Sequence, residues 1–236
     1  QELPYNNFDE RESQFVSCYR RRIQRVPQPD KRVFLHFEGV MTAAKVYYNS
    51  EFLAEHLGGY TPFTVELTGL MTGGEDVLAV VVDSRERADI PPFGHVIDYL
   101  TYGGIYREVW LEETGETYLQ NLRVNPEKTE TGWRVYTDAY LDNARGIHGL
   151  ASLRLSLRAP DGSQSAQECI VGISGEREQT LSVSFDFDHA MLWGLDAPNL
   201  YDLDVELLYM GAILDETSCR FGFREAKFTP EGFFLN

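Results

Sequence analysis

The residues of this 236-residue chain that could do chemistry are 37 Asp and Glu side chains, five histidines and three tryptophans. Two closely spaced carboxylates on a rigid frame could act as an acid and a nucleophile, but no acid stands in a motif typical of such a pair. The histidines lack metal-ligand spacing, and only His95, in a long loop, is a candidate for function. Tryptophan rings can stack on sugars, but core packing is the expected role of Trp110, Trp133 and Trp193. Because phosphate-loop, dinucleotide and Gly-x-Ser-x-Gly motifs are missing, nucleotide and nucleophilic serine chemistry have no support.

The segment of most interest, residues 98–111, places an acid ahead of a Gly-Gly pair and a strand-forming run. The two glycines let the backbone turn, or approach another group, at no Cβ cost. The run 105–111 is rich in strand-forming residues, which predicts a strand. Arg107 lies within it, where a structural ion pair or a stacked guanidinium is expected rather than ligand binding. The preceding stretch, residues 84–102, is a long charged loop, and such loops in compact domains tend to be functional.

Charge and composition exclude several classes of function. Lys and Arg number 21 against 37 Asp and Glu, and the net charge of −16 repels phosphate backbones and anionic lipid heads. We therefore expect neither a nucleic-acid nor a membrane partner, and no apolar run approaches the length of a membrane span. The odd number of cysteines, Cys18, Cys169 and Cys219, without a Cys-x-x-Cys pair, predicts buried free thiols rather than disulfides or a zinc site. A cytoplasmic location is expected, and export stays open because the chain begins with Gln1 rather than Met.

Strand signals run through the whole chain. In the first half they fall at residues 15–26, 32–40, 44–49, 63–68 and 77–82, and residues 32–40 are apolar on both faces, which suits burial between two layers. After Ser50 the apolar spacing also fits a helix. In the second half, apolar residues alternate with polar ones around 133–141, 153–157, 181–187 and 201–209. This alternation, with short turns such as Asp161-Gly162, predicts an antiparallel sandwich of roughly 100 residues.

Several segments, taken in order, resemble one family. Residues 45–63 contain Gly-Gly-Tyr-Thr-Pro-Phe, residues 102–111 contain Gly-Gly-Ile-Tyr-Arg-Glu-Val, and residues 199–236 contain Phe-Gly-Phe-Arg-Glu and end in Gly-Phe-Phe-Leu-Asn. These segments resemble glycoside hydrolase family two, the β-galactosidase and β-glucuronidase group, and the similarity covers nearly the whole chain. The resemblance implies an all-β fold, a jelly-roll-like β-sandwich followed by an immunoglobulin-like β-sandwich. It also favours a hairpin over a helix at Ser50.

The resemblance further implies a division of the chain and a function. Residues 1–116 would form the sugar-binding domain, 117–224 the immunoglobulin-like domain, and 225–236 a linker toward a catalytic barrel that this sequence lacks. Family members hydrolyse β-linked terminal sugars with two barrel carboxylates, so this chain alone is expected to be inactive. The missing motifs and ligand spacings indicate no metal or cofactor. Asp98 precedes Gly-Gly-Ile-Tyr-Arg, and the acid at this place in β-galactosidases contacts a sugar hydroxyl, so Asp98 is the expected substrate contact, and His95, in the same loop, is the second candidate.

The expected partners are a carbohydrate of the β-glycoside class, the chain's own catalytic barrel and further copies in a homo-oligomer, whose size is open. Two other functions stay open. A free-standing carbohydrate-binding module would need an exposed aromatic platform. A structural pair of sandwiches would bind no sugar at all.

Overall fold

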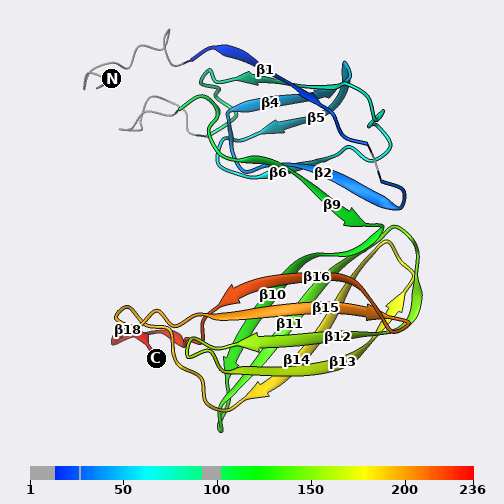
Figure 1. Ribbon diagram of the computed structural model, residues 1–236. Helices are drawn as coiled ribbons and strands as arrows, with labels where there is room; N and C mark the ends of the chain where they lie inside the picture. Colours follow the sequence, from blue (N-terminus) through cyan, green and yellow to red (C-terminus); the bar gives the residue numbers. More distant parts are fainter. Residues whose placement is uncertain (1–13, 27, 92–101) are drawn as a thin grey trace. The chain divides into compact units, whose positions relative to one another are not determined.

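The computed structural model describes residues 14–26, 28–91 and 102–236, and every regular element within them is a β-strand (Figure 1). The chain divides into two compact units, Gln1–Glu113 and Thr114–Asn236. The strands of the first unit, the last of which crosses the boundary, are β1 (Val16–Ile23), β2 (Lys31–Phe37), β3 (Val40–Met41), β4 (Ala43–Tyr48), β5 (Glu51–Leu57), β6 (Phe63–Glu66), β7 (Asp76–Asp83), β8 (Gly104–Ile105) and β9 (Val109–Gly115). Those of the second are β10 (Thr117–Lys128), β11 (Trp133–Asn143), β12 (His148–Arg158), β13 (Gln164–Ser174), β14 (Glu178–Phe187), β15 (Tyr201–Tyr209), β16 (Ala212–Phe221), β17 (Ala226–Thr229) and β18 (Gly232–Leu235).

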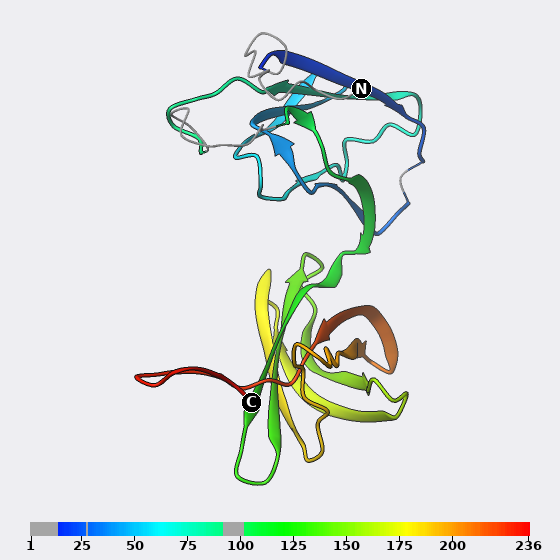
Figure 2. The same ribbon diagram turned by 90° about the vertical axis from the view of Figure 1, so that its left-hand side faces the viewer.

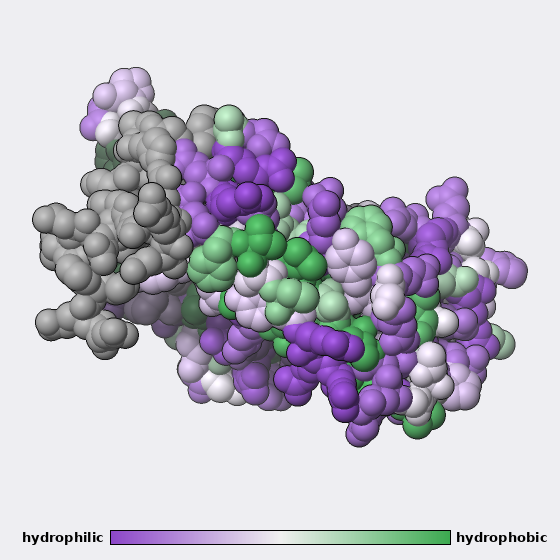
Figure 3. Space-filling model, turned by 90° about the horizontal axis from the view of Figure 1, so that it is seen from above, coloured by the Kyte–Doolittle hydropathy of each residue, from purple (hydrophilic) through white to green (hydrophobic). Residues whose placement is uncertain are grey.

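The first unit is a sandwich of two sheets, with strand orders β1-β7-β4-β5 and β6-β2-β9, and β3 pairs with β8. Its core forms where alternate residues of facing strands meet, for example Val33, Leu35 and Phe37 of β2 with Val46 of β4. The other face of the first sheet is less buried, and β7 alternates between buried and half-buried residues. Figure 3 looks down on this face, where hydrophobic residues gather between hydrophilic ones.

Burial of β2 on both faces is confirmed. On the face turned away from the core, the side chains of Arg32 and Phe34 are almost completely buried. The Arg32 guanidinium lies 4.7 Å from the Phe34 ring centroid and donates hydrogen bonds of 2.9 Å to both oxygens of Glu66 on β6. On this face the Arg32 side chain lies over the Phe34 ring and is itself held by Glu66 of the neighbouring strand β6.

The hairpin expected at Ser50 is confirmed, and the helix is excluded. β4 and β5 pair antiparallel around Asn49 and Ser50, whose φ angles are 48° and 70°. Two consecutive residues with positive φ make the tight turn that matches the twist of a hairpin. By contrast, the single strand expected at residues 105–111 is wrong, because β8 and β9 are separated by Tyr106, Arg107 and Glu108. Arg107 therefore lies exposed at a bend rather than inside a strand.

The second unit is an immunoglobulin-like sandwich of a three-stranded sheet, β10-β11-β14, and a four-stranded sheet, β13-β12-β15-β16. Alternate residues of β11, β12 and β15 are buried, and they meet the inward side of β14 in one core. No clear strand signal appears in the sequence at β10, β13 and β16, and all three are edge strands. The side chains of β13 are mostly exposed, so its sequence lacks the clean alternation of the central strands, whereas β14, also at an edge, keeps that alternation.

Residues 225–236, expected as a linker, form the antiparallel hairpin β17–β18. The cysteines are free, as expected, but Cys18 is exposed on the edge strand β1, so its expected burial is wrong. The part of the chain that the structure describes contains no helix of the length and apolarity needed to cross a membrane.

Candidate functional site

The two predicted substrate contacts, Asp98 and His95, lie outside the described residues. What the structure does describe is the framework on either side of their segment. The described residues before it, 84–91, follow β7 and are called the outgoing stem here, and those after it, 102–108, contain β8 and are called the returning stem.

Ser84 ties the two stems together. Its hydroxyl donates a hydrogen bond to the carbonyl of Met41 (3.1 Å) and accepts one from the backbone N–H of Gly104 (3.1 Å). The side chain is buried, and the strand pair β3–β8 lies next to these bonds, with Met41 opposite Gly104. One hydroxyl thus fixes the start of the outgoing stem against the end of the returning stem, within a few residues of the body.

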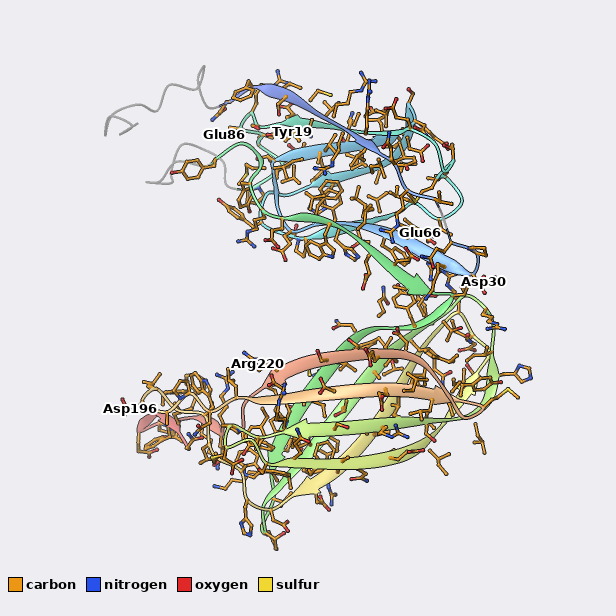
Figure 4. The ribbon with its side chains drawn as sticks, in the orientation of Figure 1. Tyr19, Asp30, Glu66, Glu86, Asp196 and Arg220 are labelled. Carbon is orange, nitrogen blue, oxygen red and sulfur yellow. The ribbon has the colours of Figure 1, made fainter. Side chains whose placement is uncertain are left out.

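Gly104 allows the returning stem to pass close to Tyr19 on β1. Its φ of +92° is unfavourable for residues with a Cβ, and a Cβ there would overlap the hydroxyl of Tyr19. The same hydroxyl accepts a hydrogen bond from the N–H of Ile105 (3.4 Å). Tyr19 on β1 and Glu86 beyond β7, labelled in Figure 4, belong to the end of the unit where β1 begins and β7 finishes. The Gly-Gly element recognised in the sequence therefore allows the backbone to approach Tyr19 closely.

The outgoing stem carries two charged pairs close in sequence. Arg85 donates hydrogen bonds to both carboxylate oxygens of Asp83 (2.9 and 2.6 Å), and Arg87 does the same to Asp89 (3.0 and 2.8 Å). Donation from the arginines holds the pKa of both carboxyl groups below its usual range. Ile90, which follows, is buried. The outgoing stem is thus anchored by the buried Ile90, and Arg85 and Arg87 are already paired with acids.

The returning stem is held by Tyr106, whose hydroxyl donates a hydrogen bond of 2.6 Å to the carbonyl of Gly59. The Arg107 guanidinium lies 5.5 Å from the Tyr106 ring centroid, in agreement with the stacked guanidinium expected from the sequence. Gly39 makes room for this pair, since a Cβ there would come within 2.9 Å of the tyrosine. Tyr106 thereby joins the returning stem to the Gly58-Gly59 turn.

The tryptophans fall into different environments. Trp133 is buried against Phe223, as predicted, and Trp193 is half-buried with the Arg224 guanidinium 5.3 Å from its ring. The expectation of core packing is wrong for Trp110, which is 42% exposed on β9. Its outward position could not be inferred from the sequence, because the run 105–111 carries one charged residue and at least two apolar or aromatic residues on each face.

Trp110 belongs to an ordered polar and aromatic cluster on the outer face of β6-β2-β9. Its ring stacks on the imidazole of His36, with centroids 5.1 Å apart and planes 11° apart. The imidazole is itself fixed, by hydrogen bonds to Glu112 (2.7 Å) and Thr64 (2.9 Å). An exposed indole whose plane is held by a fixed neighbour can accept the apolar face of a sugar ring without further ordering.

A general acid for glycoside hydrolysis needs a carboxyl group with a raised pKa, and the clear pKa shifts among the described carboxyl groups go the other way. Burial raises the pKa of Asp76, but hydrogen bonds from Thr72, Asn49 and Tyr48 outweigh burial and hold it at about 2. Every other described carboxyl group with a clear departure has a lowered pKa, mainly because a side chain donates a hydrogen bond to it: Asp83, Asp89, Asp161, Asp186, Asp202, Glu225 and Glu231. Within the described ranges, the His, Cys, Asp and Glu side chains form no group that could hold a metal ion.

Two family models match the chain in succession. Residues 3–115 match "Glycosyl hydrolases family 2, sugar binding domain", and residues 117–224 match "Glycosyl hydrolases family 2". Among curated relatives, a β-galactosidase of Thermoanaerobacterium thermosulfurigenes is 37% identical over the whole of this chain and 33% of its own length. A β-glucuronidase of Bacteroides fragilis is 32% identical over 87% of this chain and 31% of its own length. The chain therefore spans about a third of the length of these relatives.

Solved structures show the same arrangement of strands. The crystal structure of a β-glucuronidase from Bacteroides uniformis matches 94% of this chain and 28% of its own chain, with a TM-score of 0.84 and 25% identity.

Proposed function

The chain belongs to glycosyl hydrolases family 2 and corresponds to the N-terminal part of the family's β-glycosidases. On that premise we propose that it is the non-catalytic N-terminal region of a β-glycosidase of the β-galactosidase type. It would support a catalytic barrel and shape the rim of its pocket, and the whole protein would hydrolyse O-glycosyl bonds. The observation that carries the rim role is the closure of the two stems by Ser84 and Gly104. A loop with tied stems can present a side chain to a neighbouring domain at low entropic cost.

Within this proposal Asp98 accepts a hydrogen bond from a substrate hydroxyl and His95 lies on the same rim. In the full-length enzyme, Asp98→Ala should lower kcat/KM by about 10- to 100-fold, because a hydrogen bond to a charged group contributes about 1.5–3 kcal/mol. Asp89→Ala is the matched control, since Asp89 belongs to the same loop and is already paired with Arg87. An unchanged kcat/KM for Asp98→Ala would remove this role from Asp98.

The 236-residue chain by itself is proposed to hydrolyse nothing. The proposal is supported by the direction of the pKa shifts at Asp76 and Asp202, which hydrogen bonds lower, whereas a general acid needs a raised pKa. The test is the release of nitrophenol from nitrophenyl β-glycosides by the purified chain. Turnover above that of a heat-denatured sample would refute the proposal.

A second function, carbohydrate binding by the isolated chain, is favoured by the fixed and exposed ring of Trp110. It would be tested by calorimetric titration of the 236-residue chain with β-linked oligosaccharides. Trp110→Ala should abolish any binding, while Tyr136→Ala, which removes a ring of nearly equal exposure on β11, should not. No binding by the unmodified chain would refute this function and leave the sugar contacts to the full-length enzyme.

A further inference from the structure

The C-terminal hairpin carries an apolar face that has no cover in its own unit. In β17–β18, Phe228 stands opposite Phe233, and their ring centroids lie 5.0 Å apart. Because side chains alternate between the faces of a strand, Ala226 and Leu235 lie on the same face as these two rings. Phe228 is 86% exposed and Phe233 54% exposed. One face of the hairpin is thus apolar, and it is open at the two phenylalanines, while Leu235 is half-buried.

The opposite face of the hairpin differs in composition. Lys227 stands opposite Phe234, and Thr229 lies on this face as well. Lys227 forms an ion pair of 2.7 Å with Glu225. The two faces therefore differ, because one carries only apolar side chains and the other combines Lys227 and Thr229 with the exposed Phe234. Figure 2 shows it projecting from the strands of its unit.

The base of the hairpin is fixed. The N–H of Asn236 donates to the carbonyl of Glu225 (2.8 Å), and the Asn236 side chain accepts from the N–H of Glu225 (3.0 Å) and donates to the carbonyl of Trp193 (3.0 Å). Trp193, together with Arg224, lines a groove of about 480 Å³ beside this base. Polypeptide that follows Asn236 would therefore start from a fixed point next to both the apolar face and the groove.

We propose that the apolar face of the hairpin (Ala226, Phe228, Phe233 and Leu235) docks on the domain that follows Asn236 in the same polypeptide. The inference rests on the proposed function, which places a catalytic barrel there. Two observations favour this occupant over others. The relatives are about three times as long as this chain, and the fixed position of Asn236 delivers the next segment beside the apolar face. A two-stranded hairpin is at best marginally stable alone, so such a contact would also order it.

The test is hydroxyl-radical footprinting of the 236-residue chain and of the full-length protein, with oxidation of each phenylalanine read by mass spectrometry. Phe228 and Phe233 should lose most of their oxidation in the full-length protein, whereas Phe234, which lies on the other face and is as exposed as Phe233, should keep more of its own. Equal oxidation of Phe228 and Phe233 in both proteins would overturn the inference, as would a natural polypeptide that ends at Asn236. Protection that already appears in the 236-residue chain and rises with its concentration would assign the face to a second copy and overturn it too.

A pair of variants supplies an independent readout. In the full-length protein, Phe233→Ser should open the junction after Asn236 to limited proteolysis, and Phe234→Ser should not. Equal sensitivity of both variants would count against docking through the apolar face. Glycosidase activity separates the two proposals. If the hairpin is protected but the full-length protein shows no glycosidase activity, docking stands and the proposed function falls. If the protein is active but the hairpin is unprotected, the proposed function stands and docking falls.

Discussion

Replacing Asp76 by Asn should unfold the first unit at a much lower temperature, although the two side chains have the same size. Asp76 is a buried carboxylate at the start of β7. One of its oxygens accepts hydrogen bonds from Asn49 Nδ2 (2.8 Å) and Thr72 Oγ1 (2.7 Å), and the other from Tyr48 Oη (3.0 Å) and Thr72 N (3.0 Å). Asn49 also accepts from the N–H of Val77, so this carboxylate fixes the β4–β5 turn against β7.

The cost follows from this geometry. The pKa of Asp76 falls from 3.8 to about 2, which corresponds to about 2 kcal/mol at ~1.36 kcal/mol per tenfold change in proton affinity. In Asn, the amide NH₂ must point at either Asn49 Nδ2 or Thr72 N, and both of these are already donors. One buried donor is therefore left without an acceptor in either orientation, at a further ~1–3 kcal/mol. The total of roughly 3–5 kcal/mol lowers the midpoint of the first unit by roughly 10–20 °C.

Differential scanning calorimetry of the 236-residue chain measures this loss, and pH gives a second check. Because the folded pKa of Asp76 lies below the unfolded one, its linkage contribution is complete above about pH 5 and is lost as pH falls through 3.8 toward 2. About half of the stabilisation that comes from the lowered pKa remains at pH 3. The difference in thermal midpoint between the natural chain and Asp76→Asn should therefore become smaller on acidification. Asp89→Asn, which removes an exposed charge from an ion pair, is the control and should change little. Two results would refute this account of the Asp76 cluster. One is a decrease in thermal midpoint at pH 7 no greater than that of the control, and the other is a difference in midpoint that is no smaller at pH 3.

Three further predictions concern single positions. Thr137→Val should raise stability by ~1 kcal/mol in urea unfolding, because the buried hydroxyl of Thr137 has no hydrogen-bond partner among the described residues; Thr137→Ser, which keeps the hydroxyl and loses the methyl, should not. Gly104→Ala should destabilise the first unit by ~1–3 kcal/mol and lower its thermal midpoint. Adding Tyr19→Phe to this variant should restore part of the loss, because it removes the overlapping hydroxyl. No effect of Gly104→Ala would contradict the close approach of Gly104 to Tyr19. A thiol reagent at pH 8 should modify the exposed Cys18 before Cys219, since burial, and next the charge of Asp204, raise the pKa of the Cys219 thiol; mass spectrometry showing the reverse order would count against this.

The central strands could be predicted because their burial repeats every two residues. In β11 and β15, alternate side chains enter a shared core, and the sequence carries that period directly. The segment after Ser50 shows the limit of such patterns. Its apolar residues fit a helix locally, and the hairpin is decided by pairing with β4 and by the left-handed Asn49-Ser50 turn. Those determinants lie outside the window in which the helical period was found.

Exposure was harder to predict than secondary structure. Trp110 and Cys18 were expected to be buried because their residue types usually are. Cys18 lies on an edge strand, and Trp110 lies on a sheet face that a second sheet does not cover. Which strands end at an edge depends on sheet order, and sheet order is set by contacts between residues far apart in the chain. The same reasoning explains why the Ser84–Gly104 closure was missed, since it joins residues twenty positions apart through one hydroxyl.

The stability of the two units explains the buried polar side chains, but it does not explain the exposed aromatic rings of the C-terminal hairpin. Asp76 and Asn143 are buried with partners from several loops, so the stability of the two units explains why polar side chains stand there. The apolar face of the hairpin has no such partners, because every residue of β17 is exposed and Phe228 and Phe233 contact each other rather than the core of the unit. Contiguous exposed aromatic rings favour association with another surface. The proposed docking on the following domain would supply that surface and so account for Phe228 and Phe233.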